Sequence, residues 1–263
     1  MDFTYKEHYT IDDLIQIMAL LRGENGCPWD KAQTHESIRK NFLEETYEVV
    51  EAIDLKDSAL LREELGDVLL QVVFHARMEE EAGHFDFAEV CDQLCKKLVF
   101  RHPHVFGTVK AEDADEALQN WTAQKMEEKG QKTYTDTLNA APKALPALMY
   151  AEKVQGRAAK AKFDYPSLEA ALVDLESELV EFKDALLGGD SAQIEEEFGD
   201  LLFSCVNVSR FAHLDPENSL YRAVQKFIRR FSKMEAMCRE KGISLPQAGM
   251  DVLNMYWKEA KRG

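Results

Sequence analysis

The sequence contains few residues that interrupt helices and no segment that is typical of a sheet. Only 13 glycines and 7 prolines occur among 263 residues, and no segment alternates Val, Ile or Thr with polar residues over the length of a strand. No run of eighteen uninterrupted apolar residues is present, and the N-terminal stretch MDFTYKEHYT has no apolar core. These absences argue against a β fold, a membrane span and an export signal. We therefore expect an all-α protein.

Cysteine is sparse and shows no pairing pattern. The five cysteines are odd in number and form no C-x-x-C motif. We expect reduced thiols, which predicts a cytoplasmic protein. The sequence also lacks the pattern G-x-x-x-x-G-K-[ST], so it has no P-loop for binding phosphate.

Positive charge is in deficit. Lys and Arg number 32 against 48 Asp and Glu, and the formal net charge is −16. Such a chain repels phosphodiester polymers and anionic lipid surfaces unless its basic residues are locally concentrated, so we expect neither a nucleic-acid polymer nor a membrane as partner. A bound divalent cation inverts the local field of carboxylates. Small polyanions therefore remain candidate ligands if the acidity marks a metal site.

Helical periodicity divides the chain into two sets of helices. The expected helices lie at about residues 11–22, 34–55, 58–81, 87–100 and 113–129, and again at about 145–159, 167–187, 191–213, 216–241 and 251–262. Turn-rich pieces are expected at GENGCPWD and RHPHVFG, and the polar stretch EEKGQKTYTDT separates the two sets. This organisation predicts two domains, residues 1–130 and 131–263.

The two sets of helices align with each other. At an offset of 133 residues, Glu45 falls on Glu178 and Asp67 falls on Asp200, and no gap is needed between these points. The chain is therefore an internal duplication of a unit of roughly 130 residues, which is the size of a small domain.

Each half carries a pair of consecutive helices with carboxylates on one face. The first helix has two glutamates three residues apart, and the second has a Glu and an Asp three residues apart. The residues are Glu45, Glu48, Glu64 and Asp67 in the N-terminal half, and Glu178, Glu181, Glu197 and Asp200 in the C-terminal half. A short turn capped by Asp57 or Asp190 joins the helices, so they should be antiparallel neighbours. If the two faces meet, four carboxylates converge in each half.

A run of glutamates is usually a solvated helix face. The second helix argues against this interpretation, because VLLQVVF and LLFSCVNV place apolar residues all round its axis. We expect this helix to be buried on nearly all sides, which puts its carboxylates at the edge of the core and, because five helices could not cover it, predicts a homodimer.

Clustered carboxylates repel one another unless a cation lies between them. An all-oxygen set without His or Cys favours Mg²⁺, or Mn²⁺, over zinc. Because Mg²⁺ usually shares its remaining positions with water and phosphate oxygens, the expected ligand is a phosphorylated substrate.

Basic and aromatic residues are repeated as well. KLVFR corresponds to KFIRR, with cations one turn apart that could hold phosphate oxygens, and Trp-x-x-x-Lys occurs in both halves with an indole that could stack on a base. An exposed basic turn and a core tryptophan are the ordinary alternatives. The candidates for substrate binding are Lys226, Arg229, Arg230, Trp257 and Lys261, together with Lys97, Arg101, Trp121 and Lys125 of the N-terminal half.

Two other classes of protein use similar helices. A di-iron carboxylate bundle needs Glu-x-x-His on two helices, and the one such string, Glu81 to His84, contains Gly83 at a helix end and is not repeated. A non-catalytic regulatory module that binds metal and nucleotide without turnover stays open as the alternative.

Seven ordered segments resemble the two-domain bacterial MazG family of nucleoside triphosphate pyrophosphohydrolases over essentially the whole chain. They are GCPWDKAQT, LEETYEVVEA, EELGDVLLQVVFHA, RHPHVFG, LPALMYAEKVQ, EEEFGDLLF and KFIRRF. The resemblance implies an all-α dimer in which paired helices of both subunits form four-helix bundles. It also implies Mg²⁺-dependent hydrolysis of NTPs and dNTPs to monophosphate and pyrophosphate, in a role that clears aberrant or excess nucleotides.

The resemblance assigns roles to residues of the C-terminal half, which is held to be the catalytic half in such proteins. The implied metal ligands are Glu178, Glu181, Glu197 and Asp200, and the implied nucleotide contacts are Lys226, Arg230 and Trp257. Glu178 and Glu181 are the expected activators of the attacking water. The family's E-E-x-x-E motif is complete from Glu44 to Glu48, but Ser177 replaces its first glutamate in the C-terminal half.

Overall fold

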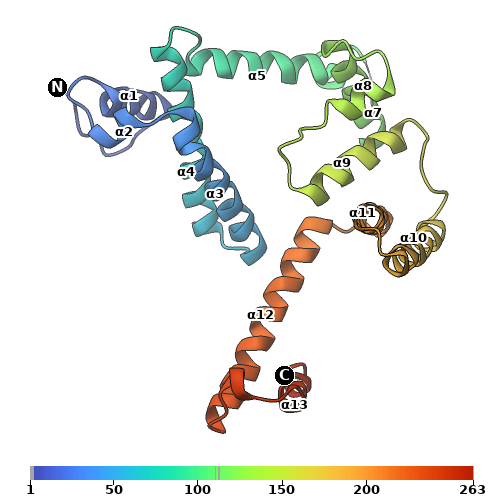
Figure 1. Ribbon diagram of the computed structural model, residues 1–263. Helices are drawn as coiled ribbons and strands as arrows, with labels where there is room; N and C mark the ends of the chain where they lie inside the picture. The colour runs from blue at the N-terminus through green and yellow to red at the C-terminus, as the bar shows by residue number, and fades with distance from the viewer. Residues whose placement is uncertain (1–2, 110, 112, 263) are drawn as a thin grey trace. The chain divides into compact units, whose positions relative to one another are not determined.

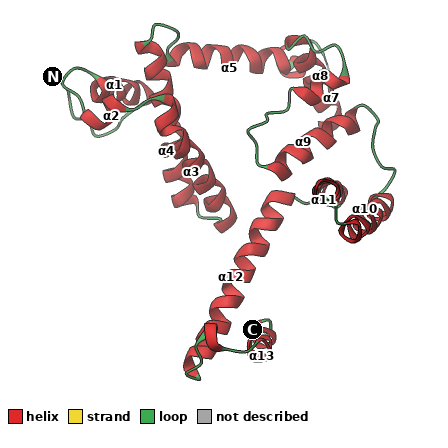
Figure 2. Ribbon diagram, viewed as in Figure 1, coloured by secondary structure: helices red, strands yellow, loops and turns green. Residues whose placement is uncertain are grey.

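The computed structural model describes residues 3–109, 111 and 113–262, and within these residues it is built of helices without a strand (Figure 1, Figure 2). The prediction of an all-α fold is thereby confirmed. The chain divides into two compact units, residues 1–125 and 126–263, which we call unit 1 and unit 2.

Unit 1 is organised around one pair of long helices. Its helices are α1 (Ile11–Arg22), α2 (Pro28–Ala32), α3 (His35–Leu55), α4 (Ser58–Glu81), α5 (Phe87–Arg101) and α6 (Pro103–Phe106), and α7 (Ala114–Glu128) continues into unit 2. The helices α3 and α4 pack against each other along their length, and α1 packs on α4. The buried core joins all three through Met18, Ile38, Val73, Phe74 and Met78.

Unit 2 repeats this arrangement. Its helices are α8 (Tyr134–Asn139), α9 (Ala147–Lys160), α10 (Leu168–Gly188), α11 (Ser191–Phe211), α12 (Pro216–Glu240), the 3₁₀ turn η1 (Leu245–Gln247) and α13 (Met250–Ala260). The helices α10 and α11 form the long pair, α9 packs on α11, and α13 packs on α12.

Equivalent caps begin the long helices in the two units. Thr34 caps α3 and Ser167 caps α10, each by accepting a hydrogen bond from a backbone N–H of the first turn. Asp57 and Asp190 cap α4 and α11 in the same way. Each residue of unit 2 follows its counterpart by 133 positions, which is the offset of the carboxylate residues. The first helices α1 and α9 can therefore be compared at this offset as well.

The expected helices agree closely with the observed ones, and the differences lie in the connections. GENGCPWD and RHPHVFG were expected as turns, but α2 begins within the first and α6 lies within the second, and α8 begins within the polar stretch EEKGQKTYTDT. Proline is the first residue of both α2 and α6. It is favoured there because a backbone N–H at the first helical position would have no partner within the helix, so proline loses no hydrogen bond.

The prediction that α4 and α11 are buried on nearly all sides is wrong for the single chain. Leu65 and Leu69 of α4 are exposed, as are Phe198, Leu202 and Phe203 of α11. The apolar pattern is present, but the chain's own helices cover only one side of it.

Within the residues that the structure describes, no helix combines the length and the apolar character that crossing a membrane would need.

Candidate functional site

In unit 1 the two long helices bring carboxylates together. Glu45 and Glu48 on α3 and Glu64 on α4 each offer an oxygen atom, and these three atoms lie within 4.8 Å of one another. Asp67 is outside this group, but its charge acts on both Glu45 and Glu64. Three of the four predicted residues thus meet, and the fourth stands beside them.

Electrostatics opposes this cluster in the absence of a cation. Desolvation and the neighbouring charges of Asp67 and Glu48 raise the pKa of Glu45. The pKa of Glu64 is raised by desolvation and by the charges of Glu48 and Asp67. Glu45 and Glu64 therefore hold their protons more strongly in the folded unit than in the unfolded chain.

Unit 2 builds the same cluster with a different member at its edge. Oxygen atoms of Glu178 on α10 and of Glu197 and Asp200 on α11 lie within 4.8 Å of one another. The fourth residue, Glu181, accepts a hydrogen bond of 3.0 Å from the hydroxyl group of Ser177. The serine that replaces the first glutamate of the motif thus orients one of the carboxylates.

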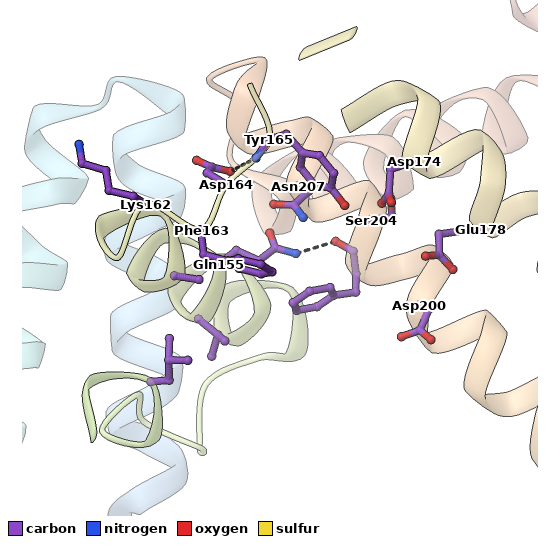
Figure 3. A pocket seen from close by; sticks show the side chains of 14 residues that line it. Gln155, Lys162, Phe163, Asp164, Tyr165, Asp174, Glu178, Asp200, Ser204 and Asn207 are labelled. Atoms are coloured by element: carbon purple, nitrogen blue, oxygen red, sulfur yellow. Dashed lines mark hydrogen bonds between the residues drawn. The ribbon is translucent and has the colours of Figure 1, made fainter. Parts of the chain in front are cut away.

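The charges in unit 2 repel one another as they do in unit 1. Desolvation together with the charge of Glu181 raises the pKa of Glu178, and Asp174 adds to the effect. Desolvation, Glu181 and Asp200 raise the pKa of Glu197. Glu178 and Asp200 lie side by side on facing helices in Figure 3.

The two clusters fit a hard divalent cation. All the donor atoms are carboxylate oxygens, which Mg²⁺ prefers, and none of the eight carboxylates forms an ion pair with a basic side chain among the described residues. A cation would relieve the repulsion that raises the pKa values. The identity of the metal and the roles of the ligands stay predictions.

A cavity of about 540 Å³ opens beside the cluster of unit 2 (Figure 3). Side chains from α8, α9, α10, α11 and the segment between α9 and α10 line it. Glu178 and Asp200 belong both to this wall and to the carboxylate cluster. A molecule in the cavity would therefore touch two carboxylates of the cluster.

Ion pairing and hydrogen bonds hold the segment between α9 and α10 in place. Arg210 of α11 binds both carboxylate oxygens of Asp164 and holds the pKa of that carboxyl below its usual range. Next to it, burial and a hydrogen bond to Asp174 raise the pKa of Tyr165 to about 12. Asp174 also accepts a hydrogen bond of 2.9 Å from Ser204. The polar groups on this side of the cavity are thus paired with one another.

Sequence reasoning missed the most unusual group in the cavity. Gln155 on α9 is 5% exposed, and its Nε2 donates a hydrogen bond of 2.7 Å to the carbonyl oxygen of Phe203, but its Oε1 has no partner. A single glutamine in an amphipathic helix gives no signal by itself. Comparison of α9 with α1 would have found it, because the two units differ at this position.

In unit 1 the residue 133 positions before Gln155 is Arg22. Its guanidinium group binds the carboxylate of Glu81 and the carbonyl oxygens of Asp30 and Gln33, and it lies 5.3 Å from the ring centre of Phe74. Phe74 itself corresponds to Asn207 of the cavity wall at the same offset. In unit 1 a charged side chain therefore occupies the region where unit 2 has its cavity.

Three of the four basic and aromatic candidates of unit 1 come together at the end of α5. Arg101 and Lys125 lie over the ring of Trp121, at 5.3 Å and 4.7 Å from its centre. Arg101 is buried and Lys97 is half-buried. Two cations already contact this indole, so Trp121 is a packing residue as well as a candidate for stacking on a base.

In unit 2 the corresponding residues lie on α12 and α13. Trp257 packs against Phe227 with ring centres 5.2 Å apart, and Lys261 lies over the indole at 5.8 Å. Lys226, Arg229 and Arg230 lie on α12, and none of them lines the cavity. The single chain thus assembles the carboxylates and the cavity, but it leaves these cations outside them.

Comparison with known proteins agrees with the duplication. Residues 33–106 and 167–234 both match the MazG nucleotide pyrophosphohydrolase domain. The chain is 43% identical over 252 residues to the nucleoside triphosphate pyrophosphohydrolase/pyrophosphatase MazG of Thermotoga maritima, covering 96% of each chain. It is 42% identical over 257 residues to the nucleoside triphosphate pyrophosphohydrolase of Escherichia coli K12, covering 96% of this chain and 97% of that one. The chain belongs to the MazG nucleotide pyrophosphohydrolase family.

Proposed function

We propose that the protein is an enzyme that hydrolyses nucleoside and deoxynucleoside triphosphates to the monophosphate and pyrophosphate, with Mg²⁺ as cofactor. The observation that carries this proposal is the cavity of unit 2, which shares Glu178 and Asp200 with a three-carboxylate cluster. The relatives in Thermotoga maritima and Escherichia coli, which match over nearly their whole length, are named for this activity.

In the proposed reaction a water molecule attacks the α-phosphorus in line with the bond to the β-phosphate. The bond between the α-phosphorus and the bridging oxygen breaks, and pyrophosphate leaves with that oxygen. A carboxylate takes a proton from the water, and Glu178, which belongs both to the cluster and to the cavity wall, is the first candidate base. Glu181, which Ser177 orients, is the second candidate base.

The residues that would hold the cation are Glu178, Glu197 and Asp200, with Glu181 at the edge of the cluster. Bound Mg²⁺ would supply neutralisation of the triphosphate's charge and polarisation of the phosphorus. Glu45, Glu48, Glu64 and Asp67 would hold a cation in unit 1 in the same way. Since Arg22 stands at the position that Gln155 has in the cavity wall of unit 2, we propose that unit 2 performs the catalysis.

We also propose that two copies of the chain form a dimer through the long helix pairs. Equivalent positions of α3 and α10 carry large exposed apolar side chains, with Tyr47 matching Val180 and Ile53 matching Leu186. Each of these four side chains is at least half exposed, at 52%, 54%, 57% and 50%. Exposed apolar side chains that gather on one helix in this way are typical of an interface. Sedimentation velocity should give a dimer at micromolar concentration, and a monomer would contradict the proposal.

The cellular setting follows from the chemistry. All five cysteines are free thiols in the structure, which suits a reducing compartment, and we place the enzyme in the cytoplasm, where nucleotide pools are made and repaired. Its role there would be to limit aberrant or surplus nucleoside triphosphates.

Phosphorus NMR of the products tests the activity directly. The protein is incubated with a nucleoside triphosphate with and without Mg²⁺, alongside the matched variants Glu181→Gln and Glu48→Gln. The proposal expects monophosphate and pyrophosphate, only with Mg²⁺, and a loss of product in Glu181→Gln but not in Glu48→Gln. Orthophosphate and diphosphate would contradict it. Absence of any Mg²⁺-dependent product with every base would leave a binding module without turnover.

A further inference from the structure

The wall of the cavity of unit 2 contains a buried hydrogen-bond acceptor, the Oε1 of Gln155, that no group in the described part of the chain satisfies. Gln155 is 5% exposed, and its Nε2 is engaged by the carbonyl oxygen of Phe203. This bond fixes the orientation of the amide, so Oε1 can only accept (Figure 3). An unpaired buried acceptor costs free energy, whereas the neighbouring Ser204 and Asp174 satisfy each other. A ligand that donates a hydrogen bond would recover this loss.

A second amide in the wall has the opposite orientation. The Oδ1 of Asn207 accepts a hydrogen bond of 3.1 Å from Arg210, and Arg210 is itself held by Asp164. The Nδ2 of Asn207 is thereby left as a donor, and no hydrogen bond from it is found within the described part of the chain. Both amides line the same cavity. The wall therefore offers one fixed acceptor and one fixed donor.

The remaining wall suits a flat aromatic group. Phe163, Tyr165 and Phe203 contribute rings to the lining, and aromatic rings stack on any nucleobase. The cavity's volume of about 540 Å³ is within the usual range of small-molecule sites. Every nucleobase carries donors and acceptors side by side on its pairing edge, which is the complement of a fixed acceptor beside a fixed donor.

The geometry points to Gln155 as a specificity-determining residue: its Oε1 accepts a hydrogen bond from an N–H on the edge of the nucleobase, while the Nδ2 of Asn207 donates to an acceptor of the same base. This inference rests on the proposed function, because it says which part of the nucleotide enters the cavity. The phosphates then extend from the cavity toward Glu178 and Asp200, which line it on the side of the cluster.

The test measures equilibrium binding, so that it does not depend on turnover. Non-hydrolysable α,β-imido triphosphates of adenosine, guanosine, cytidine and uridine are titrated by calorimetry in the presence of Mg²⁺. The variant is Gln155→Met, which keeps the length of the side chain and removes both polar atoms. The matched control is Gln71→Met in unit 1, where Gln71 is also buried with an Oε1 that has no partner but does not line this cavity.

The wild-type protein should bind one of the four bases at least about tenfold more tightly than the weakest, which is the effect of roughly one hydrogen bond. In Gln155→Met the four affinities should lie within about twofold of one another, while Gln71→Met keeps the wild-type ranking. The inference is overturned if the wild-type protein shows no base preference, or binds none of the four. It is also overturned if Gln155→Met keeps the preference, or if affinity follows the 2′-hydroxyl group, as tested with α,β-imido-dATP, rather than the base.

A second variant covers the case in which Gln155→Met fails to fold. Phe163 is 82% exposed, so Phe163→Ala leaves the core intact. Loss of one stacking ring should weaken all four nucleotides by about tenfold, with their ranking kept. Unchanged affinity for all four would overturn the placement of the base in the cavity. Base-selective binding without release of pyrophosphate would instead contradict the hydrolase and leave this inference standing.

Discussion

The two units hold the segment before their first carboxylate helix in different ways. In unit 1 the arginine that binds this segment is Arg22 on α1, and its guanidinium group lies over Phe74. In unit 2 it is Arg210 on α11, and the position of Arg22 is taken by Gln155. Unit 1 has an arginine at both positions, because Arg77 corresponds to Arg210, whereas unit 2 has Gln155 in place of Arg22 and a cavity beside its carboxylates. The duplicated chain thus keeps the acidic residues twice but offers the ligand space described here in unit 2.

The most direct test of this difference between the units is to disable one carboxylate cluster at a time. Glu178→Gln should reduce kcat by on the order of 10²- to 10⁴-fold, because it removes a ligand and a candidate base. Glu45→Gln, the matched change in unit 1, should leave kcat within about twofold of the wild type. Initial rates of pyrophosphate release measure both. Equal losses in the two variants would mean that both units catalyse, or that the clusters are coupled.

The two arginines can be compared directly through stability. Arg22→Gln removes hydrogen bonds to Glu81 and to two carbonyl oxygens from a side chain that is 8% exposed, and it should destabilise unit 1 by about 2–3 kcal/mol. Arg210→Gln should cost less, about 1 kcal/mol, because the side chains of Arg210 and Asp164 are 20% and 26% exposed.

Hydrogen exchange resolved to single helices measures each unit separately, which a single unfolding curve of a two-unit chain does not. Faster exchange is expected in α1 and α4 for Arg22→Gln, and in α9 and α11 for Arg210→Gln. If Arg210→Gln destabilised its unit more than Arg22→Gln does, the expectation that the more buried Arg22 contributes more stability would be contradicted.

The pH dependence of stability should show the repulsion within the clusters. The pKa values of Glu178 and Glu197 are raised above their ordinary value of 4.5, so the folded chain retains protons that the unfolded chain releases. Without metal, these groups lower stability as pH rises from about 4.5 through their folded pKa values. Mg²⁺ binds the ionised groups, so the rise of Tm on adding Mg²⁺ should increase over the same interval, reaching a few degrees at neutral pH.

Calorimetry at a series of pH values, with Mg²⁺ or EDTA, gives this dependence. The double variant Glu178→Gln, Glu197→Gln removes two of the clustered charges of unit 2. The part of the pH dependence of Tm that these two groups cause should then disappear. A Tm that responds equally to Mg²⁺ at pH 4 and at pH 7 would show that the cation does not bind at the carboxylates.

The smallest expected effect concerns the first position of the motif. In unit 1 Glu44 pairs with Lys40 one turn earlier, but the equivalent residues of unit 2 are Ser177 and Val173. Ser177→Glu places a charge one turn from Glu181 without a cation, and it should destabilise α10 by about 0.2–0.5 kcal/mol. Adding Val173→Lys should recover this loss, since Val173 is 67% exposed and can be replaced without disturbing the core. Hydrogen exchange in α10 of the single and double variants measures the difference.

Much of the fold was predictable because local signals mark it. The capping residues Thr34, Asp57, Ser167 and Asp190 stand at the starts of the four long helices, and a cap side chain bonds only to its own first turn. The helix pairs and the meeting of the carboxylates follow from these starts and from helical spacing. No long-range information was needed for this part.

The cavity could not be predicted, because it depends on contacts between residues far apart in the chain. Gln155 is oriented by its hydrogen bond to the carbonyl oxygen of Phe203, and Arg22 by its hydrogen bond to Glu81, which is 59 positions away. Glutamine and arginine are both common in helices, so neither residue indicates a cavity by its type alone. The prediction that α4 and α11 are buried on nearly all sides was wrong for a related reason. A hydrophobic pattern indicates that a surface is covered, but not whether the same chain covers it.

The exposed apolar faces of α3 and α10 have a consequence for assembly if second copies cover them. A chain with two such faces can pair with one partner at both, which closes the complex, or with two partners, which starts an open chain of copies. Pairing at one face raises the effective concentration for pairing at the other, so the closed form gains avidity from the covalent link between the units. A charge introduced into one face alone would then loosen the complex without separating it.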